Sequence, residues 1–187
     1  MTAAGVHYAI DKSSSRFTVR AFATGMLSSL GHSPTFAIRD FDGEIDFSPD
    51  DLSATALRLS VRAESLEVMD DIKSSDRREM ESTMNQRVLE TTKYPEITFA
   101  SSGVTTSRLG EGRYQANLNG TLTLHGQSRQ ITIPTQVTLM GDMLRAGGEW
   151  GLSQSNFGIA PVSVAGGTLK LKDEVKFSFD IVARKQE

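Results

Sequence analysis

Alternation of apolar and polar residues is the feature that most limits the folds open to this chain. In ALRLSVRA, residues 56–63, apolar side chains occupy every second position and the positions between them are mainly polar. Successive side chains of a strand point to opposite faces, so this period indicates a strand with one buried face. The same pattern recurs at 114–124, 130–139 and 174–183, which predicts a mainly antiparallel sheet.

Turn-forming residues separate the alternating segments at short intervals. Gly, Asp, Ser and Pro gather at 48–51, 109–112, 126–128 and 140–143. Strands joined by short, evenly spaced turns form either a sandwich of two sheets or an up-and-down barrel. No repeat or linker divides the 187 residues, so a single domain over residues 1–187 is expected.

Some positions depart from the regular strand pattern. The alternation changes phase between residues 36 and 47, which a bulge near Arg39 and Asp40 would explain. Gly120 falls on the apolar face of its strand, where a missing side chain suits a bend or a close approach of backbone. The pair Gly147–Gly148 lacks the lysine and helix that follow a phosphate-binding loop, and is interpreted as a bend or loop.

The segment DRREMESTMNQRVLE, which begins at Asp76, is the one that has the pattern of a helix. Asp76 is placed as the N-cap, and Glu79 at the third helical position completes a capping box. Met80, Met84 and Val88 then line one face at four-residue spacing. Flexible methionines suit a helix that lies over an irregular apolar opening, although filling of gaps in the core is the simpler explanation.

Residue types suited to catalysis or metal binding are few. Cysteine is absent, and His7, His32 and His125 share no metal-ligand spacing with one another or with a carboxylate. No catalytic motif accompanies them, and His125, just before Gly126 at a strand end, is interpreted as a turn residue bonded to a backbone group. No catalytic residue, metal site or cofactor is therefore predicted.

The distribution of charge argues against two further classes of partner. The 20 basic and 23 acidic residues give a net charge of -3 and are spread along the chain, so no surface for nucleic acid or anionic membrane is expected. No apolar run reaches the roughly 18 residues of a membrane-spanning helix. The chain as given starts without an export signal, so a cytoplasmic location is expected, or a periplasmic one if such a signal has been removed.

The inward-facing strand positions are mainly apolar, and few polar groups suited to chemistry accompany them. A sandwich would interlock two inner faces, whereas a closed sheet of about eight strands can hold one small ligand. A long aliphatic chain gains about 0.8 kcal/mol per buried methylene. A closed barrel of this kind would suit a non-enzymatic carrier of a long apolar ligand, which needs no catalytic motif. Two alternatives stay open: an enzyme acting on a bound lipid through His32 or His125, and a packed β-barrel interaction module without ligand.

Several segments taken together resemble the YceI-like family. They are YAIDKSSSRFTVRAF, FDGEIDF, DRREMESTMNQRVLETTKYPEITFAS, NGTLTLHGQSRQITIPTQV and SNFGIAPVSVAGGTLKLKDEVKFSFDI, across about residues 7–184. The YPxITF and GxLTLHG motifs, in that order, carry most of the resemblance. It implies an all-β fold, an antiparallel eight-stranded lipocalin-like β-barrel with one short α-helix near the barrel mouth. It also implies an apolar tunnel that binds polyisoprenoids, isoprenoid quinones or fatty-acid-like amphiphiles.

The chain departs from the family pattern in two places. Ser14 stands where many relatives have a histidine, and the export signal that most relatives carry is missing from the chain as given. The resemblance carries over no catalytic residue. The partner it implies is a long-chain isoprenoid or another amphiphilic lipid, for binding, transport or storage, and a homodimer is one option for the assembly.

The side chains expected to contact the ligand are inward-facing strand residues, joined at the mouth by the helix methionines. Trp150 and Phe157 are included because large aromatic side chains beside Gly-rich or polar sequence are poorly explained as ordinary inner-face residues. Plain core packing is the alternative for each position, because alternation identifies the inner face and not a cavity. The predicted ligand-binding residues are Phe17, Val19, Phe36, Ile38, Leu57, Leu59, Val61, Met80, Met84, Phe99, Leu122, Leu124, Trp150, Phe157, Phe177 and Phe179.

Overall fold

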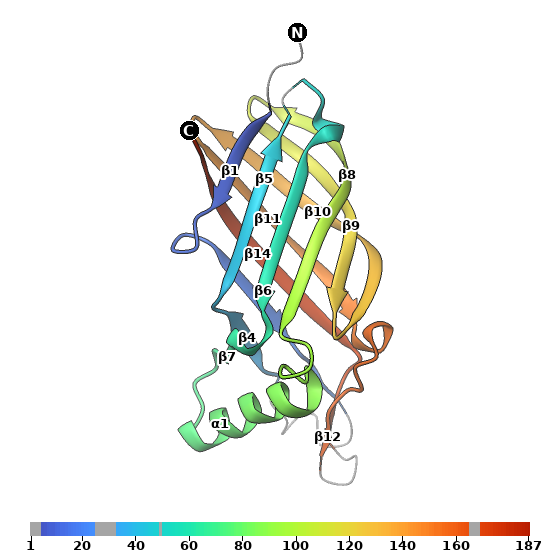
Figure 1. The fold of residues 1–187 in the computed structure, drawn as a ribbon. Coiled ribbons are helices and arrows are strands. Elements are labelled where there is room, and N and C mark those ends of the chain that lie inside the picture. Colours follow the sequence, from blue (N-terminus) through green and yellow to red (C-terminus); the bar gives the residue numbers. More distant parts are fainter. Residues whose placement is uncertain (1–4, 25–32, 49, 165–168) are drawn as a thin grey trace.

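A closed antiparallel barrel forms the body of the protein (Figure 1). The computed structural model describes residues 5–24, 33–48, 50–164 and 169–187. The barrel closes because β14 pairs with β11 on one side and with β1 on the other, which confirms the predicted eight-stranded barrel. In ring order the strands are β1 (Val6–Ile10), β5 (Phe41–Phe47), β6 (Ala56–Arg62), β8 (Glu96–Gly110), β9 (Arg113–Leu124), β10 (Gln127–Met140), β11 (Met143–Ser153) and β14 (Glu174–Lys185).

Three short strands extend the barrel wall at one end. β2 (Arg16–Arg20) pairs with β14, β4 (Thr35–Ile38) pairs with β2, and β7 (Leu66–Val68) pairs with β4. The break between β4 and β5 at residues 39–40 accounts for the change of phase seen in the sequence. Within the described ranges, β7 is the free edge of this sheet.

The same end carries the helix and a second, small sheet (Figure 1). The helix α1 (Ser74–Thr83) continues directly into a π-helical turn, Met84–Val88, and no helix in the described ranges is long and apolar enough to cross a membrane. The small sheet has the order β12 (Ser163–Val164), β13 (Leu169–Leu171) and β3 (Ala23–Thr24). Short 3₁₀ turns occupy Leu52–Ala54, Ala63–Ser65 and Gln154–Phe157.

The start of α1 differs from the predicted capping box. The helix begins at Ser74, and Lys73, which takes the N-cap position, makes no side-chain cap bond. The predicted roles of Asp76 as N-cap and Glu79 at the third position are therefore wrong. Hydrogen bonds from the middle of the helix to β7, described below, position α1 instead of a capping residue.

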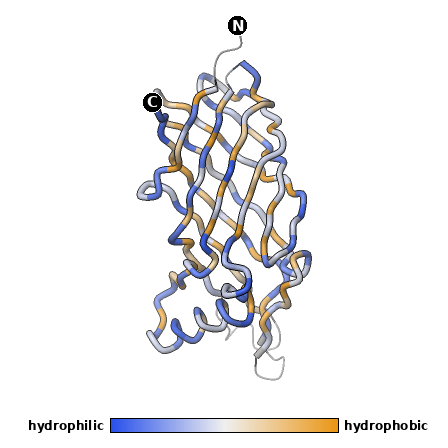
Figure 2. Tube along the Cα trace, in the orientation of Figure 1, coloured by the Kyte–Doolittle hydropathy of each residue, from blue (hydrophilic) through white to orange (hydrophobic). Residues whose placement is uncertain are grey.

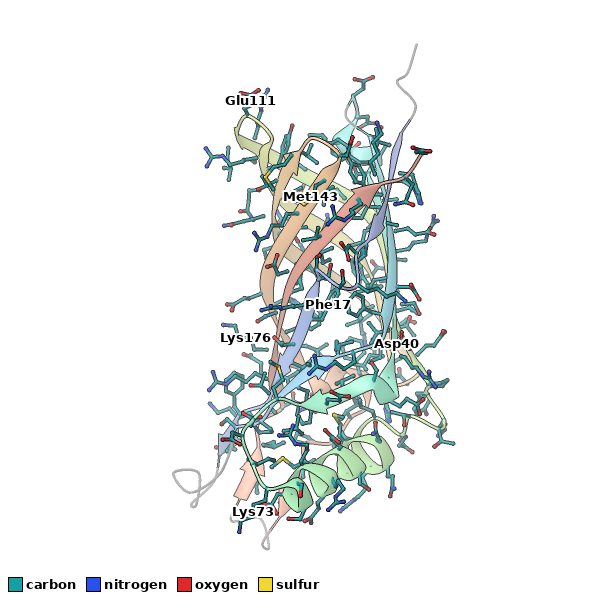
Figure 3. All side chains as sticks on the ribbon, turned by 90° about the vertical axis from the view of Figure 1, so that its left-hand side faces the viewer. Phe17, Asp40, Lys73, Glu111, Met143 and Lys176 are labelled. Carbon is teal, nitrogen blue, oxygen red and sulfur yellow. The ribbon has the colours of Figure 1, made fainter. Side chains whose placement is uncertain are left out.

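Two-residue turns join the long strands. His125 and Gly126 connect β9 to β10 with φ angles of 52° and 70°, and a type I′ hairpin turn requires positive φ at both positions. Gly112 and Gly141 supply φ angles of 63° and 56° in the turns at the opposite end, where Glu111 and Met143 are labelled in Figure 3. The predicted turns at 109–112 and 140–143 are thus confirmed, and the turn predicted at 126–128 lies one residue earlier.

Hydrophobic and hydrophilic residues alternate along the strands (Figure 2). The barrel interior is apolar because the apolar residues of this alternation form the core. Two glycines leave room for aromatic rings there: a Cβ added to Gly120 would lie 2.6 Å from Phe99 Cζ, and one added to Gly148 would lie 3.1 Å from Phe179 Cζ. The close approach predicted at Gly120 is confirmed. Gly147–Gly148 lies inside β11, so its interpretation as a bend or loop is wrong.

Asp11 ties the loop after β1 to the end of β14. Its carboxylate accepts hydrogen bonds from Ser13 Oγ at 2.6 Å, Arg184 Nε at 2.9 Å and Ser14 Oγ at 3.1 Å. These bonds, the one from Ser13 foremost, hold the pKa of Asp11 well below its ordinary value of 3.8. Because the folded-state pKa is the lower one, this carboxylate stabilises the fold fully above about pH 4 and progressively less as the pH falls further.

Replacement of Asp11 is expected to change the acid dependence of stability. Asp11→Asn should be less stable than the wild type at neutral pH, and the difference should shrink below about pH 4 as the wild-type carboxylate takes up a proton. Urea unfolding midpoints measured across this range test the expectation. A difference between the two proteins that stays constant with pH would contradict it.

Candidate functional site: an apolar cavity under the helix

A cavity of about 480 Å³ occupies the barrel interior next to α1. This volume lies within the range of about 300–1,000 Å³ that small-molecule sites have in proteins. Every predicted ligand-binding residue except Phe157 lines the cavity. Phe17, on β2 and labelled in Figure 3, is one of them. The alternative of a packed interaction module requires a filled barrel interior. The interior contains this cavity instead.

Phe157 does not line the cavity, so its place in the predicted site has to be corrected. The side chain is only 2% exposed and belongs to the core. It stands in the 3₁₀ turn Gln154–Phe157, outside the strands, so the alternation that orients barrel residues does not apply to it. Trp150, chosen by the same argument, lies on β11 opposite Phe177 and lines the cavity.

Other wall residues were absent from the predicted site. Alternation does place Ile97, Ile133 and Val175 on the inner face, and each lines the cavity. Ile159 and Val162 also line it, but they follow the 3₁₀ turn after β11, where no strand period could identify them. The sequence signal for the wall is therefore present on the strands and lost in the segments around the mouth.

The mouth of the cavity lies at the α1 end. Among the lining residues, the exposed ones are Asp76 and Glu79 on α1 and Lys170 on β13. Thr83 on α1 and Gln154 after β11 add polar groups at this end. The cavity therefore presents an apolar interior and a polar rim that carries charges of both signs.

Side chains of α1 complete the free edge of β7. Glu81 Oε1 accepts a hydrogen bond from the Val68 N–H at 3.0 Å, and Arg77 Nη1 donates to the Val68 carbonyl. Arg77 Nη2 donates to the Asp70 carbonyl at 2.8 Å. We call these three bonds the helix clasp. They hold α1 where its Met80, and Met84 at the start of the π-helical turn, lie in the cavity wall.

Loss of the helix clasp is expected to loosen α1. Arg77→Ala removes two hydrogen bonds from a charged donor and should destabilise the docked helix by about 1–2 kcal/mol. Amide hydrogen exchange across residues 74–88 is expected to accelerate accordingly. Arg78→Ala, at the exposed neighbouring position, is the matched control, and equal exchange in the two variants would contradict a clasp at Arg77.

His125 connects three elements outside the cavity. Its Nε2 lies 2.6 Å from Glu90 Oε2, its Nδ1 lies 3.2 Å from the Phe157 carbonyl oxygen, and its ring centroid lies 4.5 Å from that of Tyr94. Both His125 and Glu90 have positive φ, at 52° and 46°. The bond to the Phe157 carbonyl confirms the interpretation of His125 as a turn residue tied to a backbone group.

The position of His125 does not support the alternative of an enzyme that acts on a bound lipid. His125 does not line the cavity, and both of its ring nitrogens are occupied by the bonds just described. His32 lies outside the described residues. In the described part of the chain, no three His, Asp or Glu side chains are grouped as metal ligands would be. Ser14 is exposed, donates to Asp11 and is not part of the cavity wall.

Comparison with known sequences identifies a family that covers nearly the whole chain. The family model described as the YceI-like domain matches residues 8–183. The protein YceI of Shigella flexneri is 27% identical over 173 residues, which are 92% of this chain and 77% of that protein. The protein YceI of Salmonella arizonae has the same identity and coverage.

Solved structures share the fold at low sequence identity. BcnA of Burkholderia cenocepacia superposes with a TM-score of 0.71 at 18% identity, covering 92% of this chain and 98% of that one. A domain from Saccharophagus degradans, described as polyisoprenoid-binding and implicated in plant cell wall breakdown, has a TM-score of 0.66 at 14% identity. That match covers 97% of this chain and 99% of the domain. At these identities the likeness concerns the fold alone.

Proposed function

The chain belongs to the YceI-like domain family, and on the basis of its cavity we propose that it is a non-enzymatic carrier of a long-chain lipid. The tail of the lipid lies among the apolar side chains inside the barrel. Its polar head group lies at the mouth, near Asp76, Glu79 and Lys170. The chemical class is a polyisoprenoid, an isoprenoid quinone or a fatty-acid-like amphiphile.

The observation that carries the proposal is the apolar cavity with charged residues at one end only. Each methylene buried in it contributes about 0.8 kcal/mol, so a tail of ten carbons would contribute about 8 kcal/mol before the costs of association. No strong polar contact is needed to reach useful affinity. The Saccharophagus degradans domain is described as polyisoprenoid-binding, which makes an isoprenoid chain the first ligand to test.

Native mass spectrometry of the purified protein, followed by organic extraction, tests the proposal. We expect a bound species whose mass matches a lipid that is recovered in the extract. We also expect an apolar fluorescent probe to bind the delipidated protein at one site and to be displaced by long-chain prenols or fatty acids. Absence of a co-purifying lipid together with absence of probe binding would contradict the carrier function.

A further inference from the structure

A second, much smaller void lies in the same barrel beyond the main cavity. It measures about 60 Å³ and is lined by residues such as Phe47, Tyr114 and Leu144, which come from the strand ends remote from α1. Four of its lining residues carry a hydroxyl, namely Thr55, Thr106, Tyr114 and Thr135, and the other twelve are apolar. The barrel axis therefore passes through two apolar spaces in succession.

Four side chains line both spaces and so lie between them. They come from β6, β9 and β14. No two of these strands are neighbours in the ring, so the four side chains enter the interior from different sides. We call this set the cavity floor. Its members are Leu57, Leu118, Phe179 and Ile181.

The cavity floor is held in place by its surroundings. Phe179 is 8% exposed and Ile181 is 3% exposed. The ring of Phe179 lies against Gly148, where an added Cβ would be 3.1 Å from its Cζ atom. It also stacks on Phe177 with ring centroids 5.9 Å apart. A tail that reaches Phe179 would have to displace a ring that is packed on two sides.

We propose that the cavity floor sets the longest lipid tail that the protein can bury. This inference rests on the proposed carrier function and adds the residues that determine specificity for chain length. A tail that enters from the α1 end gains about 0.8 kcal/mol, or about fourfold in affinity, for each methylene it buries. The gain ends where the terminal methyl group meets the floor, and further carbons stay at the mouth in water.

A homologous series of straight-chain fatty acids, competed against an apolar fluorescent probe, tests the floor. For the wild type, affinity is expected to rise about fourfold per methylene and then to reach a plateau at a definite chain length. Leu118→Ala opens the floor toward the small void, so its plateau should move to longer chains by roughly the three carbons that the substitution removes. Phe179→Leu should move the plateau in the same direction.

Matched controls exist for both substitutions. Leu122 is the same residue type on the same strand as Leu118, and Phe177 stands two positions from Phe179, but these two line the main cavity alone. Leu122→Ala and Phe177→Leu should alter affinity for all chains and leave the plateau at the wild-type length. Thermal unfolding of each variant establishes that it is folded, and Leu118→Val replaces Leu118→Ala if the latter is not.

The outcomes separate the floor from the carrier function. If both floor variants reach their plateau at the wild-type chain length, the cavity floor does not set the limit on tail length. The carrier function would still stand. Equal shifts in floor variants and controls would also overturn the role of the cavity floor, since the limit would then be total volume. If the wild type binds no member of the series and no probe, the carrier function fails and the floor fails with it.

Discussion

Replacing Leu59 by tryptophan is expected to abolish lipid binding while the barrel remains folded. Leu59 lies on β6, is only partly buried and lines the cavity, so a larger side chain can be accommodated by filling that space. If the indole excludes about five methylenes of the tail, the loss is about 4 kcal/mol, or roughly 1,000-fold in affinity. Titration with an apolar fluorescent probe measures the effect.

The control for this substitution lies at the preceding residue. The Arg58 side chain is 65% exposed, so Arg58→Trp leaves the cavity unchanged and removes only surface ion pairs with Glu44 and Asp46. Its probe affinity should equal that of the wild type. Circular dichroism and thermal unfolding show whether each variant is folded. Wild-type affinity in a folded Leu59→Trp variant would mean that the ligand lies elsewhere.

Replacing Gly148 by alanine is expected to destabilise the fold by about 3 kcal/mol, lowering the Tm by about 6–12 °C. The new Cβ would lie 2.4 Å from the Pro134 carbonyl oxygen, on backbone that cannot move without disturbing β10, and 3.1 Å from Phe179 Cζ. Differential scanning calorimetry gives both quantities.

Gly151 provides a matched comparison on the same strand. A Cβ added there would meet Glu174 Cδ at 3.4 Å, which is an ordinary contact with a flexible side chain. Gly151→Ala should therefore change the Tm little. If Gly148→Ala and Gly151→Ala have the same Tm, the close packing of Phe179 against Gly148 does not contribute to stability as argued above.

The barrel and most of its inner wall could be predicted from the sequence because one physical rule covers both. Side chains of a strand alternate between two faces, so residues such as Val61 and Phe99 were assigned to the interior by position alone. The turn at His125 and the close approach at Gly120 also followed from local backbone rules. In these places the structure depends on neighbours in the sequence.

The remaining features depend on contacts between distant segments. Alternation assigns Leu118 and Leu122 to the same face, and only the coordinates show that one separates two spaces and the other borders one of them. The start of α1 was misplaced because Arg77 and Glu81 bind β7 and no cap residue fixes the helix. Phe157 was included because a large aromatic side chain stands beside polar sequence, and that feature does not distinguish a place in the core from a place in the cavity wall.

The helix clasp has a consequence for self-association. An unpaired strand edge is a template onto which another chain can add by backbone pairing, and the clasp occupies the N–H and carbonyl of Val68 on such an edge. If α1 lifts to admit a lipid, those groups become available to a second molecule. Lipid exchange would then require α1 to move, whereas resistance to aggregation would require it to stay docked on β7. Light scattering of Arg77→Ala at increasing protein concentration tests whether loss of the clasp promotes self-association.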